Sequence, residues 1–113
     1  MVDDDPTVLD TVQAILLNEG YEVLTAADGQ EGWAVLSEQT VDLVVTDEKM
    51  PRMKGHELAK RIKAVLPTLP IVMLTGVADP PVTGPPPLVE RVVSKPFDFA
   101  DFVAVIRKLL AQH

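Results

Sequence analysis

The sequence of 113 residues contains no cysteine, which excludes disulfide bonds, thiolate metal sites and cysteine nucleophiles. It also lacks an apolar run long enough to cross a bilayer, and it shows no basic-then-apolar leader. We therefore expect a soluble, cytoplasmic protein without membrane insertion. Positive charge is scarce too: the formal net charge is −7, which argues against direct nucleic-acid binding by this domain. No glycine-rich phosphate loop is present, so a nucleotide cradle is not indicated.

The sequence does contain enough apolar material for one compact domain over residues 1–113, since 47% of its residues are hydrophobic. Apolar runs with strand character alternate with segments of helical period. The expected strands are residues 21–26, 41–47, 70–75 and 90–95, and the expected helices are residues 6–19, 29–38, 55–66 and 98–111. The last three strands are almost continuously apolar, which is typical of parallel strands covered on both faces. This alternation predicts an α/β domain with right-handed crossovers.

Capping residues mark the ends of two of these helices. Asp5 precedes the helix over residues 6–19 and can accept hydrogen bonds from its first N–H groups, while Gly20 can end it. Asp98 can cap the last helix in the same way.

Two places interrupt the regular alternation. Between Thr75 and Lys95, where a helix is due, the chain reads GVADPPVTGPPPLV, with five prolines among fourteen residues. Each proline in a helix interior destabilises the helix by about 3 kcal/mol relative to alanine. We therefore expect a loop there, with at most one short helical turn. At the start, only Met1 and Val2 precede three consecutive aspartates. A first strand leading to Asp3 is therefore either truncated or begins upstream of residue 1.

Polar side chains stand where the expected strands end. They are Asp3 and Asp4 after the short first segment, Asp47, Thr75 and Lys95. The carboxyl ends of parallel strands lie at one edge of a sheet, and ligands of open α/β sheets bind beyond that edge. We therefore expect three carboxylates, a hydroxyl and an ammonium group to converge in one crevice.

This set of groups suits phosphoryl chemistry around a hard cation. Clustered carboxylates repel one another unless a cation neutralises them, and oxygen ligands without nearby histidine or cysteine favour Mg²⁺ (or Mn²⁺). A carboxylate such as Asp47 can act as a nucleophile toward phosphorus and form an aspartyl phosphate. Mg²⁺, Lys95 and the Thr75 hydroxyl would then surround the oxygens of the transferred group.

In this order, the acidic pair Asp3–Asp4 and the segments DLVVTDEKMPRMKG, IVMLTG and VVSKPF resemble the receiver domain of two-component response regulators. The resemblance covers nearly the whole chain. It implies a flavodoxin-like, three-layer α/β/α fold with a five-stranded parallel sheet of order 2-1-3-4-5. The proline-rich segment implies that the fourth helix of that fold is shortened or absent.

The resemblance also implies roles for individual residues in a phosphorelay. Asp47 accepts a phosphoryl group from a phosphohistidine of a histidine kinase or a histidine phosphotransfer protein. Asp4 and Asp47 ligate Mg²⁺ by their side chains, Asp3 acts mostly through water, and Lys49 contributes its backbone carbonyl. Lys95 pairs with Asp47 and later with the phosphate.

The switch that the resemblance implies is incomplete in this chain. Thr75 is expected to follow the phosphoryl oxygen inward on activation, but Val92 stands where many receivers carry an aromatic residue that moves with the threonine. Val92 and the missing helix both argue against the dimer that many transcription-factor receivers form. We expect a monomer or weak dimer, similar to receivers of hybrid sensor kinases or to free-standing receivers.

Several readings of these residues remain open. The leading one is a phospho-accepting signalling switch that slowly hydrolyses its own phosphoryl group and is not a turnover enzyme. The alternative is a pseudo-receiver, which is not phosphorylated and serves as a protein-binding or dimerisation module. A phosphatase is disfavoured, because Lys49 occupies the place of the general acid that such chemistry requires.

Some side chains near the site also have structural readings. Asp3 and Asp4 can belong to a solvated turn, and Lys49 can be an exposed lysine or pair with Glu48 or the acidic site. His56 and His113 are expected at the surface without a partner carboxylate at metal spacing, and Trp33 is expected to pack within its helix layer.

Overall fold

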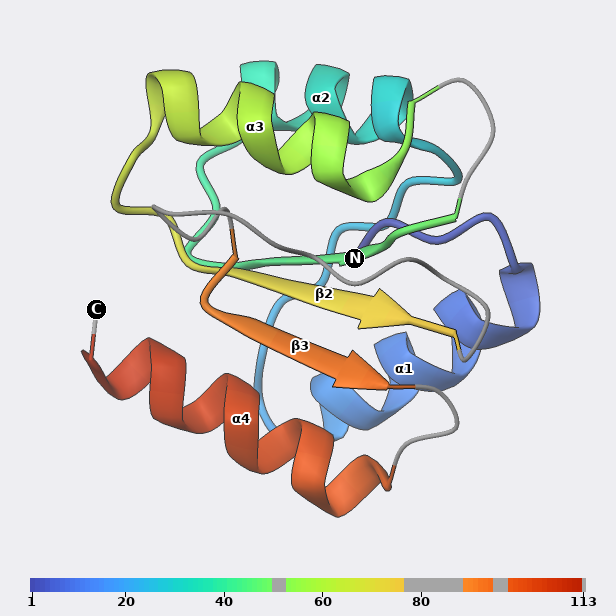
Figure 1. Ribbon diagram of the computed structural model, residues 1–113. Helices are drawn as coiled ribbons and strands as arrows, with labels where there is room; N and C mark the ends of the chain where they lie inside the picture. Colours follow the sequence, from blue (N-terminus) through green and yellow to red (C-terminus); the bar gives the residue numbers. More distant parts are fainter. Residues whose placement is uncertain (50–52, 77–88, 95–97, 113) are drawn as a thin grey trace.

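The computed structural model describes residues 1–49, 53–76, 89–94 and 98–112. Parallel strands form the middle layer, with two helices on each side (Figure 1). In chain order the elements are α1 (Pro6–Asn18), α2 (Gly29–Glu38), β1 (Val44–Asp47), α3 (Gly55–Val65), β2 (Ile71–Thr75), β3 (Arg91–Ser94) and α4 (Phe99–Gln112). Every expected helix is present, and all bounds agree within one residue.

The predicted capping residues act at the helix ends. The Asp5 carboxylate accepts a hydrogen bond of 2.9 Å from the backbone N–H of Thr7 in the first turn of α1. Gly20, just beyond the end of α1, has a φ of +92°, a conformation that costs glycine little. The Asp98 carboxylate accepts a hydrogen bond of 2.7 Å from the N–H of Ala100 at the start of α4. These three predictions are confirmed.

The sheet extends beyond its three named strands through the N-terminal residues. Strands β1, β2 and β3 pair in that order, all parallel. Val2 forms parallel bridges to Ala26 on one side and to Thr46 on the other. Its N–H donates to the carbonyl of Val45 at 2.7 Å, and the N–H of Asp3 donates to the carbonyl of Ala26 at 3.1 Å. The spatial order of the five chain segments is therefore 2-1-3-4-5, as predicted.

The segment over residues 21–26 is less regular than the predicted strand, because only Ala26 makes a bridge. Residues 21–24 and 41–43 instead line an open cavity of about 440 Å³, together with Met1 and parts of the flanking helices. An extended segment becomes a strand only when a neighbour satisfies its N–H and C=O groups. Among the described residues, the bridge that Ala26 makes is to Val2, which also bridges Thr46.

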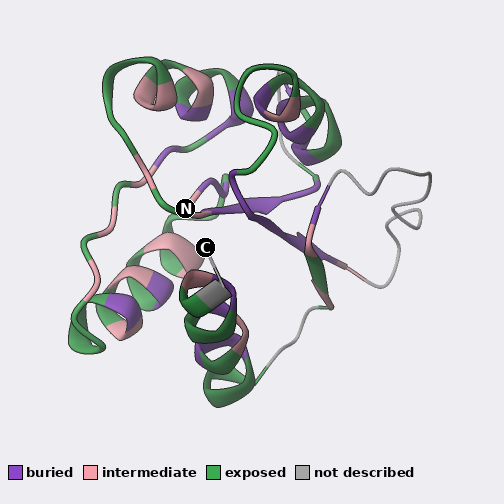
Figure 2. Cartoon of the chain, turned by 90° about the vertical axis from the view of Figure 1, so that its left-hand side faces the viewer, coloured by how far each residue is buried: buried purple, intermediate pink, exposed green. Residues whose placement is uncertain are grey.

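The sheet separates two apolar clusters. The helices α2 and α3 cover one face, and α1 and α4 cover the other (Figures 1 and 2). The first cluster includes Leu58, Ile62, Ile71 and Met73, and Trp33 packs against it as expected. The second cluster includes Val12, Leu16, Val72, Leu74, Phe102 and Ile106. Strand β2 is buried along its whole length and contributes to both clusters, so it fixes the position of everything at its carboxyl end.

Strand β3 differs from the prediction that it is covered on both faces. Its residues are exposed or half-exposed, and the side chain of Val92 keeps 48% of its surface accessible. Among the described strands, β3 pairs only with β2, so it is an edge strand. The expectation for the proline-rich segment falls largely on residues 77–88, outside the described part of the chain. Within the described ranges, no helix is long and apolar enough to cross a membrane.

Candidate functional site: an acidic cluster at the strand ends

Asp47 is the last residue of β1 and lies opposite Leu74 of β2 in the parallel register. The next residue stays attached to the sheet, because the N–H of Glu48 donates to the carbonyl of Leu74 at 3.0 Å. The Asp47 residue is only 6% exposed. The sheet therefore holds this carboxylate at its carboxyl edge, in a largely buried position.

Asp3 and Asp4 reach the same edge from the N-terminal segment. The N–H of Asp47 donates to the carbonyl of Val2 at 2.8 Å, which brings the residues after Val2 beside the end of β1. Asp3 is fully buried, and its carboxylate accepts a hydrogen bond of 3.0 Å from the N–H of Asp5. Asp4 is exposed. One aspartate is thus fixed by the start of α1, and its neighbour faces the solvent.

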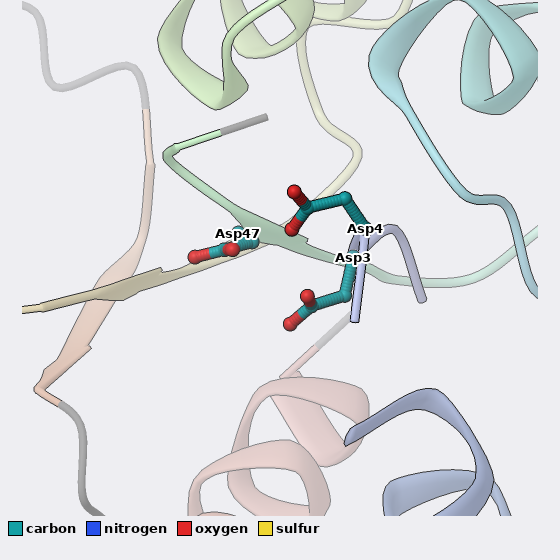
Figure 3. A group of neighbouring side chains, drawn as sticks. All are labelled: Asp3, Asp4 and Asp47. Carbon is teal, nitrogen blue, oxygen red and sulfur yellow. The ribbon is translucent and has the colours of Figure 1, made fainter. Parts of the chain in front are cut away.

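The three carboxylates form one cluster. One oxygen from each of Asp3, Asp4 and Asp47 lies within 4.8 Å of the other two. Figure 3 shows the three carboxylate groups turned to the same side, beyond the end of β1. Oxygens that bind Mg²⁺ at 2.0–2.1 Å lie at most about 4.2 Å apart, so the cluster needs a small contraction or one water-bridged ligand. The residues present therefore fit a small divalent cation.

The other three predicted site residues do not belong to this cluster of carboxylates, and each has its own position. They are Thr75, Lys49 and Lys95. Thr75 ends β2, is 8% exposed and lies one residue beyond Leu74, the partner of Asp47. Lys49 is exposed, two residues after Asp47. Lys95 lies outside the described residues. It directly follows Ser94, which is the partner of Thr75 in the register of β2 and β3.

Sequence analysis missed a side-chain pair next to Asp47. Glu48 is only 5% exposed, and its carboxylate oxygen Oε1 lies 2.7 Å from Nδ1 of His56. The same oxygen accepts a hydrogen bond of 3.3 Å from the backbone N–H of His56. His56 lies at the surface as expected, and its ring makes a hydrogen-bonding contact with Glu48 that the sequence did not predict. The Glu48 carboxylate contacts His56 instead of Lys49. The first turn of α3 returns beside Glu48, a contact that helical or strand period does not reveal.

Gly55, at the start of α3, lies tightly against the end of β1. The N–H of Gly55 donates to the carbonyl of Glu48 at 2.9 Å. A Cβ atom added to Gly55 would lie 2.3 Å from the backbone oxygen of Asp47 and 2.8 Å from Sδ of Met73. Only glycine allows this approach, so the start of α3 is set against the backbone of the candidate site.

The parallel α/β sheet and the carboxylates at the ends of its inner strands are typical of one class of proteins. These are α/β proteins with an acidic, metal-dependent site at the edge of the sheet. Comparison with known proteins identifies the family. The family model described as "Response regulator receiver domain" matches residues 1–107. The chain belongs to this family.

Named relatives and a solved structure agree with this assignment. The chain is 43% identical over 76 residues to the transcriptional regulatory protein GlrR of Escherichia coli, covering 67% of this chain and 17% of that protein. It is 34% identical over 117 residues to the response regulator Rre1 of Synechocystis, covering 99% of this chain and 51% of the relative. The signal receiver domain of a histidine kinase from Syntrophus aciditrophicus matches with a TM-score of 0.87 and 27% identity, covering 98% and 87% of the two chains. The chain thus spans about half or less of these two curated relatives.

Membership of this family indicates the general function of the chain. Receiver domains are phosphorylation-based signalling switches of two-component systems and not classical turnover enzymes, and their partners include histidine kinases. Receiver domains generally bind Mg²⁺ at an acidic pocket, and the cluster of Asp3, Asp4 and Asp47 has the corresponding composition. The flavodoxin-like fold predicted from the sequence is confirmed.

Proposed function

We propose that Asp47 is the phospho-accepting residue of this receiver domain. An Asp47 oxygen attacks the phosphorus of a phosphohistidine on a histidine kinase or phosphotransfer protein. A new O–P bond forms while the N–P bond breaks, and the leaving imidazole nitrogen takes up a proton. The observation that carries the proposal is the convergence of three carboxylates within 4.8 Å at the end of β1. Two buried carboxylates and an exposed one at a single sheet edge support this assignment, because ligands of open α/β sheets bind beyond that edge.

Asp3, Asp4, Asp47 and the backbone carbonyl of Lys49 are the proposed ligands of Mg²⁺ or Mn²⁺. When bound, the cation supplies positive charge to the phosphoryl oxygens and offsets the repulsion among the carboxylates. Asp47 is largely buried, which limits the water that can reach the phosphorylated side chain. Slow self-hydrolysis follows from this limited access.

Thr75 and Lys95 are proposed to bind the oxygens of the transferred group. Thr75 is buried at the end of the strand next to Asp47, so a small displacement brings its hydroxyl to a phosphoryl oxygen. The Lys95 ammonium is assigned to neutralise first the Asp47 carboxylate and then the phosphate. Together these groups couple phosphorylation to a change at the carboxyl edge of the sheet, which alters the surface offered to a protein partner.

The domain over residues 1–113 is proposed to act through protein contact as a monomer or weak dimer. Val92, which is exposed on the edge strand, supports a monomer or weak dimer. It stands where many receivers carry an aromatic residue that moves with the threonine, and valine is too small to take that part. Incomplete switching would also suit a pseudo-receiver, which keeps the fold and is never phosphorylated.

Phosphorylation by a small phosphodonor separates these two functions. The protein is incubated with acetyl phosphate and Mg²⁺, and its intact mass is measured. We expect one added phosphoryl group in the unchanged protein and none in Asp47→Asn. Asp42→Asn removes an exposed carboxylate outside the cluster and serves as the control, which should be phosphorylated normally. A folded protein that binds Mg²⁺ but gains no mass would establish the pseudo-receiver.

A further inference from the structure

Glu48 is a buried carboxylate beside Asp47 to which phosphoryl transfer assigns no role. Only 5% of its surface is exposed. Burial of a carboxylate is costly unless hydrogen bonds replace the lost water. Its oxygen Oε1 receives two contacts from one residue, the backbone N–H of His56 at 3.3 Å and the ring atom Nδ1 at 2.7 Å. The His56 side chain is 49% exposed, so the ring reaches inward from the surface to this carboxylate.

The chemistry of the contact defines its direction. In the tautomer that carries its hydrogen on Nδ1, the His56 ring donates a hydrogen bond that the Oε1 atom of Glu48 accepts. A donor to a charged acceptor makes a stronger and more directional bond than one between neutral groups. The orientation of the Glu48 side chain is therefore set by the ring of His56.

Glu48 is also held through its backbone on both sides. Its N–H donates to the carbonyl of Leu74 at 3.0 Å, and its carbonyl accepts from the N–H of Gly55 at 2.9 Å. With the two contacts from His56, four bonds converge on the single residue that separates Asp47 from the Lys49 peptide. A displacement of the Glu48 backbone would shift both neighbours, and these are a proposed side-chain ligand and a proposed carbonyl ligand.

We infer that His56 is a positioning residue of the Asp47 site: its Nδ1–H bond to Glu48 holds Asp47 and the Lys49 carbonyl in the geometry that binds the divalent cation. The inference deepens the proposed function and rests on it. The surface turn that begins α3 thereby contributes to metal affinity without touching the metal. Residues that orient metal ligands through hydrogen bonds are known to affect affinity by roughly 10- to 100-fold.

A purely structural role makes a different prediction. If the pair only stabilises the first turn of α3, its loss lowers the melting temperature and leaves the affinity for Mg²⁺ unchanged. The two roles are separated by measuring both quantities on the same variants. The exposed pair of Arg107 and Glu19, 2.8 Å apart between α4 and α1, lies on other elements and provides the control.

The experiment titrates the folded protein with Mg²⁺ alone and follows its amide resonances by NMR, which needs no phosphodonor. For His56→Ala we expect the dissociation constant to rise by about fivefold, less than for a residue bonded directly to a metal ligand. His56→Asn places an amide donor where Nδ1 lies and should restore the constant to within about twofold. Arg107→Ala should leave it unchanged. If His56→Ala does not fold, His56→Leu fills the same space without a donor and replaces it.

The outcomes distinguish this inference from the proposed function. If the unchanged protein shows no Mg²⁺ binding, the proposed metal site itself is wrong. If it binds Mg²⁺ and His56→Ala binds equally well or better, the positioning role of His56 is overturned while the site stands. If His56→Asn is as weak as His56→Ala, the hydrogen bond from Nδ1 is not the cause, and the inference is likewise overturned.

Discussion

At the scale of single residues, the acidic site concentrates negative charge in a protein that already carries a net charge of −7. Asp3 and Asp47 are buried by the fold, whereas Asp4 is exposed and can be changed without opening the core. Charges a few ångströms apart repel one another even when one of them faces water. Any such repulsion is a cost to folding, and a cation bound among these carboxylates would reduce that cost.

Replacing Asp4 with asparagine tests this cost. We expect Asp4→Asn to raise the melting temperature of the metal-free protein by about 2–4 °C and to remove most of the rise that Mg²⁺ produces in the unchanged protein. Differential scanning calorimetry with and without Mg²⁺ measures both effects. Asp10→Asn, an exposed site on α1, should keep the full response to Mg²⁺. An Asp4→Asn protein that Mg²⁺ still stabilises fully would remove Asp4 from the site.

The residues of this cluster were predictable because they stand at strand ends, where topology alone brings them together. The three aspartates follow that rule, and one carboxylate oxygen from each lies within 4.8 Å of the other two. The contact between Glu48 and His56 follows no such rule. It joins residues eight positions apart, and its geometry depends on how closely α3 approaches β1, which no periodicity in the sequence encodes.

At the scale of elements, the start of α3 is the most tightly fitted junction near the site. Gly55 has the backbone oxygen of Asp47 as its neighbour, and that atom cannot move without shifting β1. Gly20 offers a contrast, since nothing lies within 4 Å of an added Cβ and only its positive φ favours glycine.

These two glycines give a matched pair of substitutions. The methyl group of Gly55→Ala would overlap the backbone oxygen of Asp47 and push α3 away from β1. The substitution is expected to lower the free energy of unfolding by about 3 kcal/mol. Gly20→Ala meets no atom and should cost about 1 kcal/mol through its backbone conformation alone. Urea denaturation measures both values. Equal losses would contradict the close approach of α3 to β1, and a small loss at Gly55 would show that the junction can relax.

The helices were easier to predict than the strands. Amphipathic period, Asp5, Gly20 and Asp98 determine helix bounds locally, so they agree with the structure to within one residue. Strands depend on neighbours. The segment over residues 21–26 has the expected composition, but among its residues only Ala26 makes a bridge. Strand β3 has two valines at its centre and lies exposed at an edge.

At the scale of the whole molecule, the open cavity between residues 21–24 and 41–43 interrupts an otherwise continuous sheet. Val2 forms bridges to Ala26 and to Thr46, so the spacing between the two segments is the width of one strand. Apolar side chains from α1 and α4, including Leu16 and Ile106, line the cavity on one side. A strand placed there would satisfy two backbone edges and cover part of the second core cluster.

Extending the chain ahead of Met1 tests this description. Four added apolar, β-branched residues are expected to continue the path of residues 1–3 and to raise the melting temperature by about 5 °C or more, because they bury apolar surface and pair with two edges. Four added glycine and serine residues provide the control, since they offer neither side chains nor strand propensity. Equal melting temperatures for the two extensions would show that the cavity does not accept a strand.

Asp3 and Asp47 come from separate chain segments, which hydrogen bonds between Val2 and the end of β1 bring together, and this has a consequence for folding. A nascent or partly unfolded polypeptide holds these aspartates far apart and does not form the acidic cluster. The acidic cluster is therefore complete only once the N-terminal segment has docked against β1.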